Sequence, residues 1–180
     1  YAFDLVIGGR LLETRLQEME AACRDRPFRF TVHGPLSINF MGPAAHQPAF
    51  FEAAQRFIEI CARIGAPHLV LHAGMLQPAE VEALDAAYDR QREQLARLGE
   101  IAAAYAVTIC VENLFDFAPY VMTPSPAELA REIEAIAHPA IRATFDVSHG
   151  LIHAAQRGFD FMREAEALAP LAQHLHLHDS

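Results

Sequence analysis

Histidine and carboxylate side chains recur at five separate places in this 180-residue sequence, each flanked by apolar residues. Imidazole nitrogens and carboxylate oxygens together form a ligand set that suits Zn²⁺, Mn²⁺, Co²⁺ or Fe²⁺, whereas Mg²⁺ and Ca²⁺ favour oxygen ligands alone. Any one of these places alone is typical of an ordinary turn or cap, but the set predicts a divalent-metal site. The five segments are His33-Gly34-Pro35, Leu71-His72-Ala73-Gly74, Val111-Glu112-Asn113, Phe145-Asp146-Val147-Ser148-His149 and His176-Leu177-His178-Asp179.

Each segment lies at the end of a short apolar run that predicts a β-strand. Between the runs, apolar residues recur at spacings of three and four, as at Phe50, Ala54 and Ile58, which predicts amphipathic helices. Ser125-Pro126-Ala127-Glu128 has the pattern of a helix start. The strand-like runs are Phe3–Ile7, Arg29–His33, His68–His72, Thr108–Glu112, Ala143–Val147 and His174–His178.

This alternation predicts βαβ units and a parallel sheet, in which ligands bind outside the carboxyl ends of the strands. We expect an α/β fold, a parallel (β/α)8 TIM barrel present as about six βα units in one incomplete domain over residues 1–180. A complete barrel takes eight units, so we expect a fragment that lacks the first and last of them. An open, doubly wound sheet is the alternative, although neither GxGxxG nor GxxxxGK[ST] follows any strand.

Composition limits the classes of partner. Lys plus Arg is 14 and Asp plus Glu is 23, and the net charge of −9 argues against a nucleic-acid partner. No apolar run approaches the ~20 residues that span a bilayer, so we expect no membrane insertion. The three cysteines form no CxxC pair, which favours reduced thiols and a cytoplasmic protein.

In this order, and with Ile38-Asn39 after the first, the five motifs resemble the xylose isomerase-like TIM-barrel superfamily, which includes sugar phosphate isomerases/epimerases and endonuclease IV. The epimerase branch implies one divalent metal held by Glu112, Asp146, His176 and a final Glu that would lie beyond Ser180. It also implies a substrate contact by His149. The endonuclease IV branch implies up to three zinc ions, and the residues matching its pattern are His33, His72, Glu112, Asp146, His149 and His176.

The sequence departs from both branches. Ketose 3-epimerases carry a second acid where this chain has Ala118, and they tend to lack the histidines at positions 33 and 72. Endonuclease IV carries Asn where this chain has His178, and small residues where this chain has Leu114-Phe115-Asp116-Phe117. The resemblance is therefore informative about the superfamily and poor at naming the substrate.

The leading hypothesis is a metal-dependent isomerase or epimerase that moves a proton through an enediolate of a small sugar, sugar phosphate or polyol. Glu112 is the candidate ligand and general base, and His149 the group that orients a hydroxyl or carries a proton. The metal stays open among Mn, Co, Zn, Fe and Mg. The predicted metal ligands are Glu112, Asp146, His176, His33, His72 and His149, and the predicted substrate contacts are Asn113, Phe115 and His178.

Two alternatives remain open. One is a zinc-dependent phosphodiesterase of the endonuclease IV type, which the additional His33 and His72 favour and the acidic charge opposes. The other is a non-catalytic barrel that binds a metal or another ligand. In either case, a sheet of six units would leave its edge strands open, so pairing into a homo-oligomer is also expected.

Overall fold

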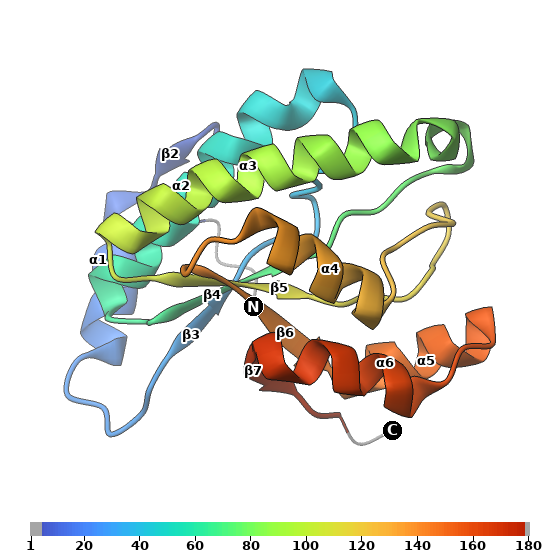
Figure 1. The fold of residues 1–180 in the computed structure, drawn as a ribbon. Helices are drawn as coiled ribbons and strands as arrows, with labels where there is room; N and C mark the ends of the chain where they lie inside the picture. Colours follow the sequence, from blue (N-terminus) through green and yellow to red (C-terminus); the bar gives the residue numbers. More distant parts are fainter. Residues whose placement is uncertain (1–4, 179–180) are drawn as a thin grey trace.

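A curled parallel sheet forms the centre of the computed structural model, which describes residues 5–178 (Figure 1). Its five strands pair in the order in which they occur in the sequence. A doubly wound sheet would reverse its strand order at a switch point, so this order is that of a TIM-barrel segment. The strands are β3 (Thr31–His33), β4 (His68–His72), β5 (Thr108–Glu112), β6 (Ile141–Asp146) and β7 (Ala172–His176).

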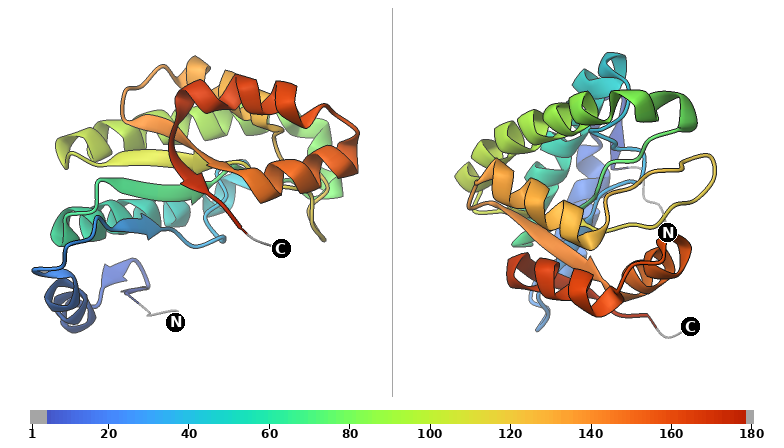
Figure 2. Two further views of the ribbon diagram at one scale, coloured as in Figure 1. Left: turned by 90° about the horizontal axis from the view of Figure 1, so that it is seen from below. Right: turned by 45° about the vertical axis from the view of Figure 1, so that its right-hand side comes forward.

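Helices cover the outer, convex face of this sheet (Figures 1 and 2). The helix start predicted at Ser125 is confirmed: its Oγ accepts the Glu128 N–H at 3.2 Å, and the Glu128 carboxylate accepts the Ser125 N–H at 2.8 Å. None of the described helices combines the length and apolar character needed to cross a membrane. The helices are α2 (Gln47–Ile64), α3 (Leu84–Ala104), α4 (Pro126–Ile136), α5 (Val147–Arg157) and α6 (Phe161–Leu168), with 3-10 turns at Ala44–His46, Pro78–Ala83 and Ala169–Leu171.

Of the first predicted strand, Phe3–Ile7, only residues 5–7 are described; they do not join the parallel sheet, so the described residues form five parallel strands instead of six. Residues 1–4 of the sequence lie outside the described residues. β1 (Val6–Ile7) pairs antiparallel with β2 (Arg10–Leu11), and α1 (Glu13–Cys23) follows. Gly8 and Gly9 join the two strands with φ angles of 54° and 74°, which glycine adopts without strain. This glycine turn folds the run back on itself.

Side-chain alternation separates the core from the candidate site. On β5, Ile109 and Val111 point outward into the core beneath the helices, so Cys110 and Glu112 point to the concave side. On the next strand, Phe145 packs outward, whereas the Asp146 carboxylate faces the imidazoles of His176 and His178. The sheet register places His72 beside Glu112 and Asp146 beside His176, all at the carboxyl ends of their strands. The strand ends therefore deliver the predicted ligands to one rim.

Candidate metal centre

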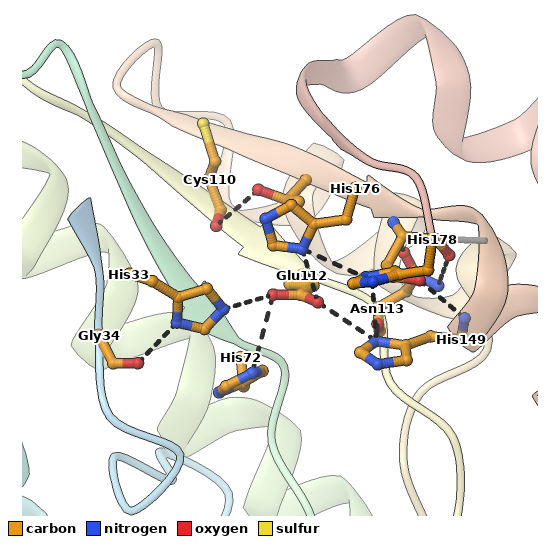
Figure 3. Close-up of polar contacts among 11 residues, drawn as sticks. His33, Gly34, His72, Cys110, Glu112, Asn113, His149, His176 and His178 are labelled. Atoms are coloured by element: carbon orange, nitrogen blue, oxygen red, sulfur yellow. Dashed lines mark hydrogen bonds and ion pairs between the residues drawn. The ribbon is translucent and has the colours of Figure 1, made fainter. Parts of the chain in front are cut away.

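Glu112 lies at the centre of the site, 1% exposed and surrounded by imidazoles (Figure 3). Its Oε2 is 3.0 Å from Nε2 of His33 and 3.7 Å from Nε2 of His72. Its Oε1 is 3.1 Å from Nδ1 of His176 and 3.2 Å from Nδ1 of His149. The four histidines come from β3, β4, β7 and α5 respectively. One buried carboxylate thus faces two different pairs of imidazoles, one pair on each oxygen.

Asp146 is the second buried carboxylate and is fully enclosed. Its Oδ1 accepts the backbone N–H of His149 at 2.8 Å, which caps the start of α5. Its Oδ2 lies 2.9 Å from Nε2 of His178, 3.5 Å from Nδ1 of His176 and 3.6 Å from Nδ1 of His149. One oxygen therefore caps a helix, and the other faces the imidazoles.

Asn113 and Phe115 extend the site beyond the carboxylates. The carboxamide of Asn113 is buried; its Nδ2 donates to the Asp146 carbonyl at 2.9 Å, and its Oδ1 accepts the Asp146 N–H at 2.8 Å. The ring of Phe115 lies 5.2 Å from the ring of His149 and 5.9 Å from the ring of Phe117. Asn113 thus holds the backbone of Asp146, and Phe115 borders the site. That Asn113, Phe115 or His178 also contacts a substrate stays a prediction.

The histidines around Glu112 differ in the direction in which their surroundings shift the pKa. Burial opposes ionisation of Glu112, but hydrogen bonds from His149 and His33 and the charges on His176 and His72 outweigh it and hold the pKa of Glu112 well below its usual range. The hydrogen bond to Glu112 raises the pKa of His33. Burial alone would lower the pKa of His149, but Glu112 and Asp146 together raise it. Burial dominates at His72 and lowers its pKa to about 4.

The donor set fits a divalent cation. Glu112 and Asp146 are both buried carboxylates, and burying two anions side by side is costly unless a cation neutralises them. Nitrogen and oxygen donors together suit Zn²⁺, Mn²⁺, Co²⁺ or Fe²⁺. Three sets of residues place ligand atoms within 4.8 Å of one another, namely His33–Glu112–His176, Asp146–His176–His178 and Glu112–Asp146–His149. Five of the six predicted ligands occur in these sets, together with His178, whereas His72 is in none of them and lies 3.7 Å from Glu112 on the same rim. That any of these residues binds metal stays a prediction.

Several residues that hold the loops of the site had no role in the sequence interpretation. The Asn39 side chain bonds to both the N–H of Met75 at 3.0 Å and its carbonyl at 2.8 Å, and so joins the loops that follow β3 and β4. Asp116 pairs with Arg157, 41 positions away. Asn39 belongs to a motif of the family resemblance, but no local pattern marks the pairing of Asp116 with Arg157.

We expect His72 to make the metal-free protein less stable as the pH falls from about 6.5 to 4, whereas His33 and His149, whose pKa values are raised, act in the opposite direction. The folded pKa of His72, about 4, lies below the ordinary value of 6.5, so the unfolded chain takes up the proton first. The gap corresponds to at most roughly 3 kcal/mol. His72→Gln removes this contribution, so the free energy of unfolding in urea, compared with that of the wild type, should shift in favour of the variant between pH 7 and pH 4. Equal changes in the two proteins would contradict the prediction.

Comparison with known proteins gives a consistent family and fold. The sequence model of the xylose isomerase-like TIM-barrel family matches residues 3–180. No curated protein sequence matches the chain. A D-tagatose 3-epimerase-like protein has a similar structure, with a TM-score of 0.77 and 21% identity over 93% of this chain and 62% of its own. The 3-keto-D-glucoside 4-epimerase of E. coli gives a TM-score of 0.74 and 20% identity over 95% of this chain and 66% of its own.

A third similar structure is a D-psicose 3-epimerase crystallised in the presence of D-fructose. Its TM-score is 0.69 and its identity 14%, over 93% of this chain and 58% of its own. At such identities the likeness concerns the fold. The chain spans between 58% and 66% of the length of these three proteins.

Proposed function

Because the chain belongs to the xylose isomerase-like TIM-barrel family, we propose that it contributes to a divalent-metal-dependent isomerase or epimerase that acts on a small sugar, sugar phosphate or polyol. The observation that carries this proposal is the buried carboxylate of Glu112, which faces imidazoles on both oxygens and shares His149 and His176 with Asp146. Structural neighbours named as epimerases support the same class of reaction.

In this proposal, Glu112, Asp146 and His176 hold the metal ion, with His33, His72 and His149 as further donors. A bound divalent ion would polarise substrate oxygens and stabilise the negative charge that develops when a neighbouring carbon loses its proton. The low pKa of Glu112 keeps its carboxylate ionised at neutral pH, before any proton reaches it from the substrate. We assign Glu112 the role of metal ligand for this reason, and the role of general base because its carboxylate lies at the centre of the site, 3.2 Å from His149.

In this proposal, the remaining residues of the site transfer a proton, exclude water or hold a ligand in place. His149 lies 3.2 Å from Glu112, which is close enough for its imidazole to pass a proton or to orient a substrate hydroxyl. Phe115 stands beside His149 and Phe117 beside Phe115, and the two rings would exclude water from that side of the site. Asn113 fixes the strand end that carries Asp146.

A second candidate function is a zinc-dependent phosphodiesterase of the endonuclease IV type. His33 and His72 favour it, because they add imidazoles on the Oε2 side of Glu112 that a single metal on the Oε1 side does not need. The net charge of −9 opposes a nucleic-acid substrate.

Metal content per chain separates these candidates. Protein purified without added metal or chelator is analysed for its elements, and then screened against ketoses, aldoses and abasic DNA. We expect about one equivalent of Mn, Co, Fe or Mg, with turnover of a sugar that chelation abolishes and added metal restores. Two or three equivalents of Zn with cleavage of abasic DNA would replace this proposal with the second candidate. Bound metal without turnover would favour a binding protein, and no metal uptake on titration would reject the proposed site.

A further inference from the structure

The segment 114–124, which follows β5, is attached to the last turn of α5 through Asp116. The Oδ1 of Asp116 accepts the backbone N–H of Thr123 at 3.0 Å, and its Oδ2 accepts Nε–H of Arg157 at 2.6 Å. Arg157 also donates to the Val121 carbonyl at 3.0 Å. The carboxamide of Gln156 bonds to both the N–H and the carbonyl of Asp116, at 3.0 Å and 2.8 Å. Together these contacts tie both ends of the segment to one helix.

The same segment is also attached on its other side. Leu76, in the loop after β4, forms an isolated antiparallel bridge with Met122. The Leu76 N–H donates to the Met122 carbonyl at 2.9 Å, and the Val121 N–H donates to the Leu76 carbonyl at 3.0 Å. Segment 114–124 is therefore hydrogen-bonded to α5 on one side and to the loop after β4 on the other. Held in this way on both sides, it forms a fixed wall of the site.

This wall presents aromatic rings to the candidate metal centre. Phe115 lies 5.2 Å from His149, Phe117 lies 5.9 Å from Phe115, and Tyr120 lies 5.5 Å from Phe117, all measured between ring centroids. His149 stands in the first turn of α5, whereas Gln156 and Arg157 stand in its last turn. One helix therefore sets the positions of both His149 and the segment that carries Phe115.

We propose that Asp116 and Arg157 are positioning residues, which fix Phe115 against His149 so that segment 114–124 forms a rigid aromatic wall of the site. An aromatic face of this kind binds the apolar C–H face of a sugar or polyol ring, while its hydroxyl groups turn toward the carboxylates and imidazoles. The sugar part of this inference rests on the proposed function, whereas the positioning of Phe115 does not.

An ordinary surface ion pair is the competing explanation. Asp116 and Arg157 have side chains 18% and 41% exposed, and partly exposed pairs often add little to stability. Such a pair would leave the position of Phe115 unchanged when it is broken. The exposure also means that Arg157 variants should fold, so the two explanations can be compared in intact protein.

The test uses a single fluorescent reporter. The chain contains no Trp, so Phe115→Trp introduces a unique fluorophore beside His149. Co²⁺ is the metal probe, and energy transfer to bound Co²⁺ reports the distance between the reporter and the site. Arg157→Met, Arg157→Lys and the matched control Arg163→Met on α6 are then each added to the reporter protein. Amide hydrogen exchange of Asp116 and Thr123 is measured in the same Arg variants without the reporter.

We expect Arg157→Met to raise acrylamide quenching of the reporter about threefold, to speed exchange of the two amides at least about tenfold, and to reduce quenching by Co²⁺ at unchanged Co²⁺ affinity. Arg157→Lys should restore part of each effect, and Arg163→Met should change none. Unchanged exchange and quenching in Arg157→Met would overturn the proposal. If the reporter protein does not bind Co²⁺, the proposed function fails, and acrylamide quenching with hydrogen exchange still decides the positioning role.

For the sugar, D-fructose is the probe. These measurements use Co²⁺-loaded protein without the Trp reporter. The Arg157→Met variant should bind D-fructose with a dissociation constant about tenfold higher than that of the wild type. An unchanged dissociation constant, with faster loop exchange, would overturn the aromatic wall as a sugar-binding surface and leave Asp116 and Arg157 as loop anchors. Absence of D-fructose binding in the wild type would count against the proposed substrate class.

Discussion

Glu112→Gln should lower both the affinity for divalent metal and the turnover by at least about 1,000-fold, with the fold intact. The substitution keeps the size of the side chain but removes the charge that two pairs of imidazoles face. It also removes a carboxylate proton acceptor, and losing a general base alone commonly costs about 10²- to 10⁴-fold in rate. Calorimetric titration with Mn²⁺ and Co²⁺ measures the first effect, and turnover of the sugar found by screening measures the second.

Glu132→Gln is the matched control for this experiment. Glu132 is on α4, on the outer side of the sheet, and pairs with Arg92 at 2.7 Å. The same chemical change there should leave metal affinity and turnover within about twofold of the wild type, because it leaves the site's donors in place. If Glu112→Gln bound metal and turned over substrate as well as Glu132→Gln, the roles assigned to Glu112 would be untenable. Circular dichroism and urea unfolding of both variants exclude a general loss of structure.

The strand ends were predictable because parallel strands obey simple rules. His68–His72 and Thr108–Glu112 were predicted with the bounds that the structure gives, since apolar runs of this length are bounded by turn residues. A carboxylate after such a run must face a cation or an opposite charge, and alternation put it on the face away from the helices. These rules locate Glu112 and Asp146 on one rim without any knowledge of the strand order.

What the sequence could not supply depends on three-dimensional contacts. The run at Phe3–Ile7 has the composition of a sheet strand, but its described end at Val6–Ile7 forms a hairpin through a glycine turn, and composition alone does not distinguish these two outcomes. The division of the two Glu112 oxygens between imidazole pairs depends on the register of β3, β4 and β7. The bond between Asp116 and Arg157 depends on how the loop after β5 passes the last turn of α5.

Asn113→Leu should lower the free energy of unfolding by about 2 to 5 kcal/mol and the metal affinity by about 10- to 100-fold. Leucine has a similar branched shape, although it is larger, and it leaves the N–H and carbonyl of Asp146 without the partners that the carboxamide supplies at 2.8 Å and 2.9 Å. Each buried backbone group that loses its hydrogen bond costs about 1–3 kcal/mol. The metal affinity falls because residues that orient ligands commonly contribute factors of this size. Urea unfolding and Co²⁺ titration measure the two effects.

Two further variants test whether the lost hydrogen bonds to Asp146 cause the losses of stability and metal affinity. Asn113→Asp keeps the acceptor for the Asp146 N–H but places a carboxylate oxygen against the Asp146 carbonyl, so it should be as harmful as Asn113→Leu. Thr144→Val on β6, the strand that ends in Asp146, is the control, because it removes one longer bond of 3.4 Å to the Cys110 carbonyl and should cost about 1 kcal/mol without loss of metal.

The pattern of effects also decides between the two roles open to Asn113. A positioning residue acts through Asp146, so stability and metal affinity should fall together in the absence of any sugar. A residue that acts only by contacting substrate would leave both unchanged and weaken sugar binding alone. Because the carboxamide is fully buried and both of its polar atoms are engaged, we expect the first pattern. The second pattern would mean that the carboxamide turns away from Asp146 when substrate binds, and that the strand end is held by its sheet neighbours.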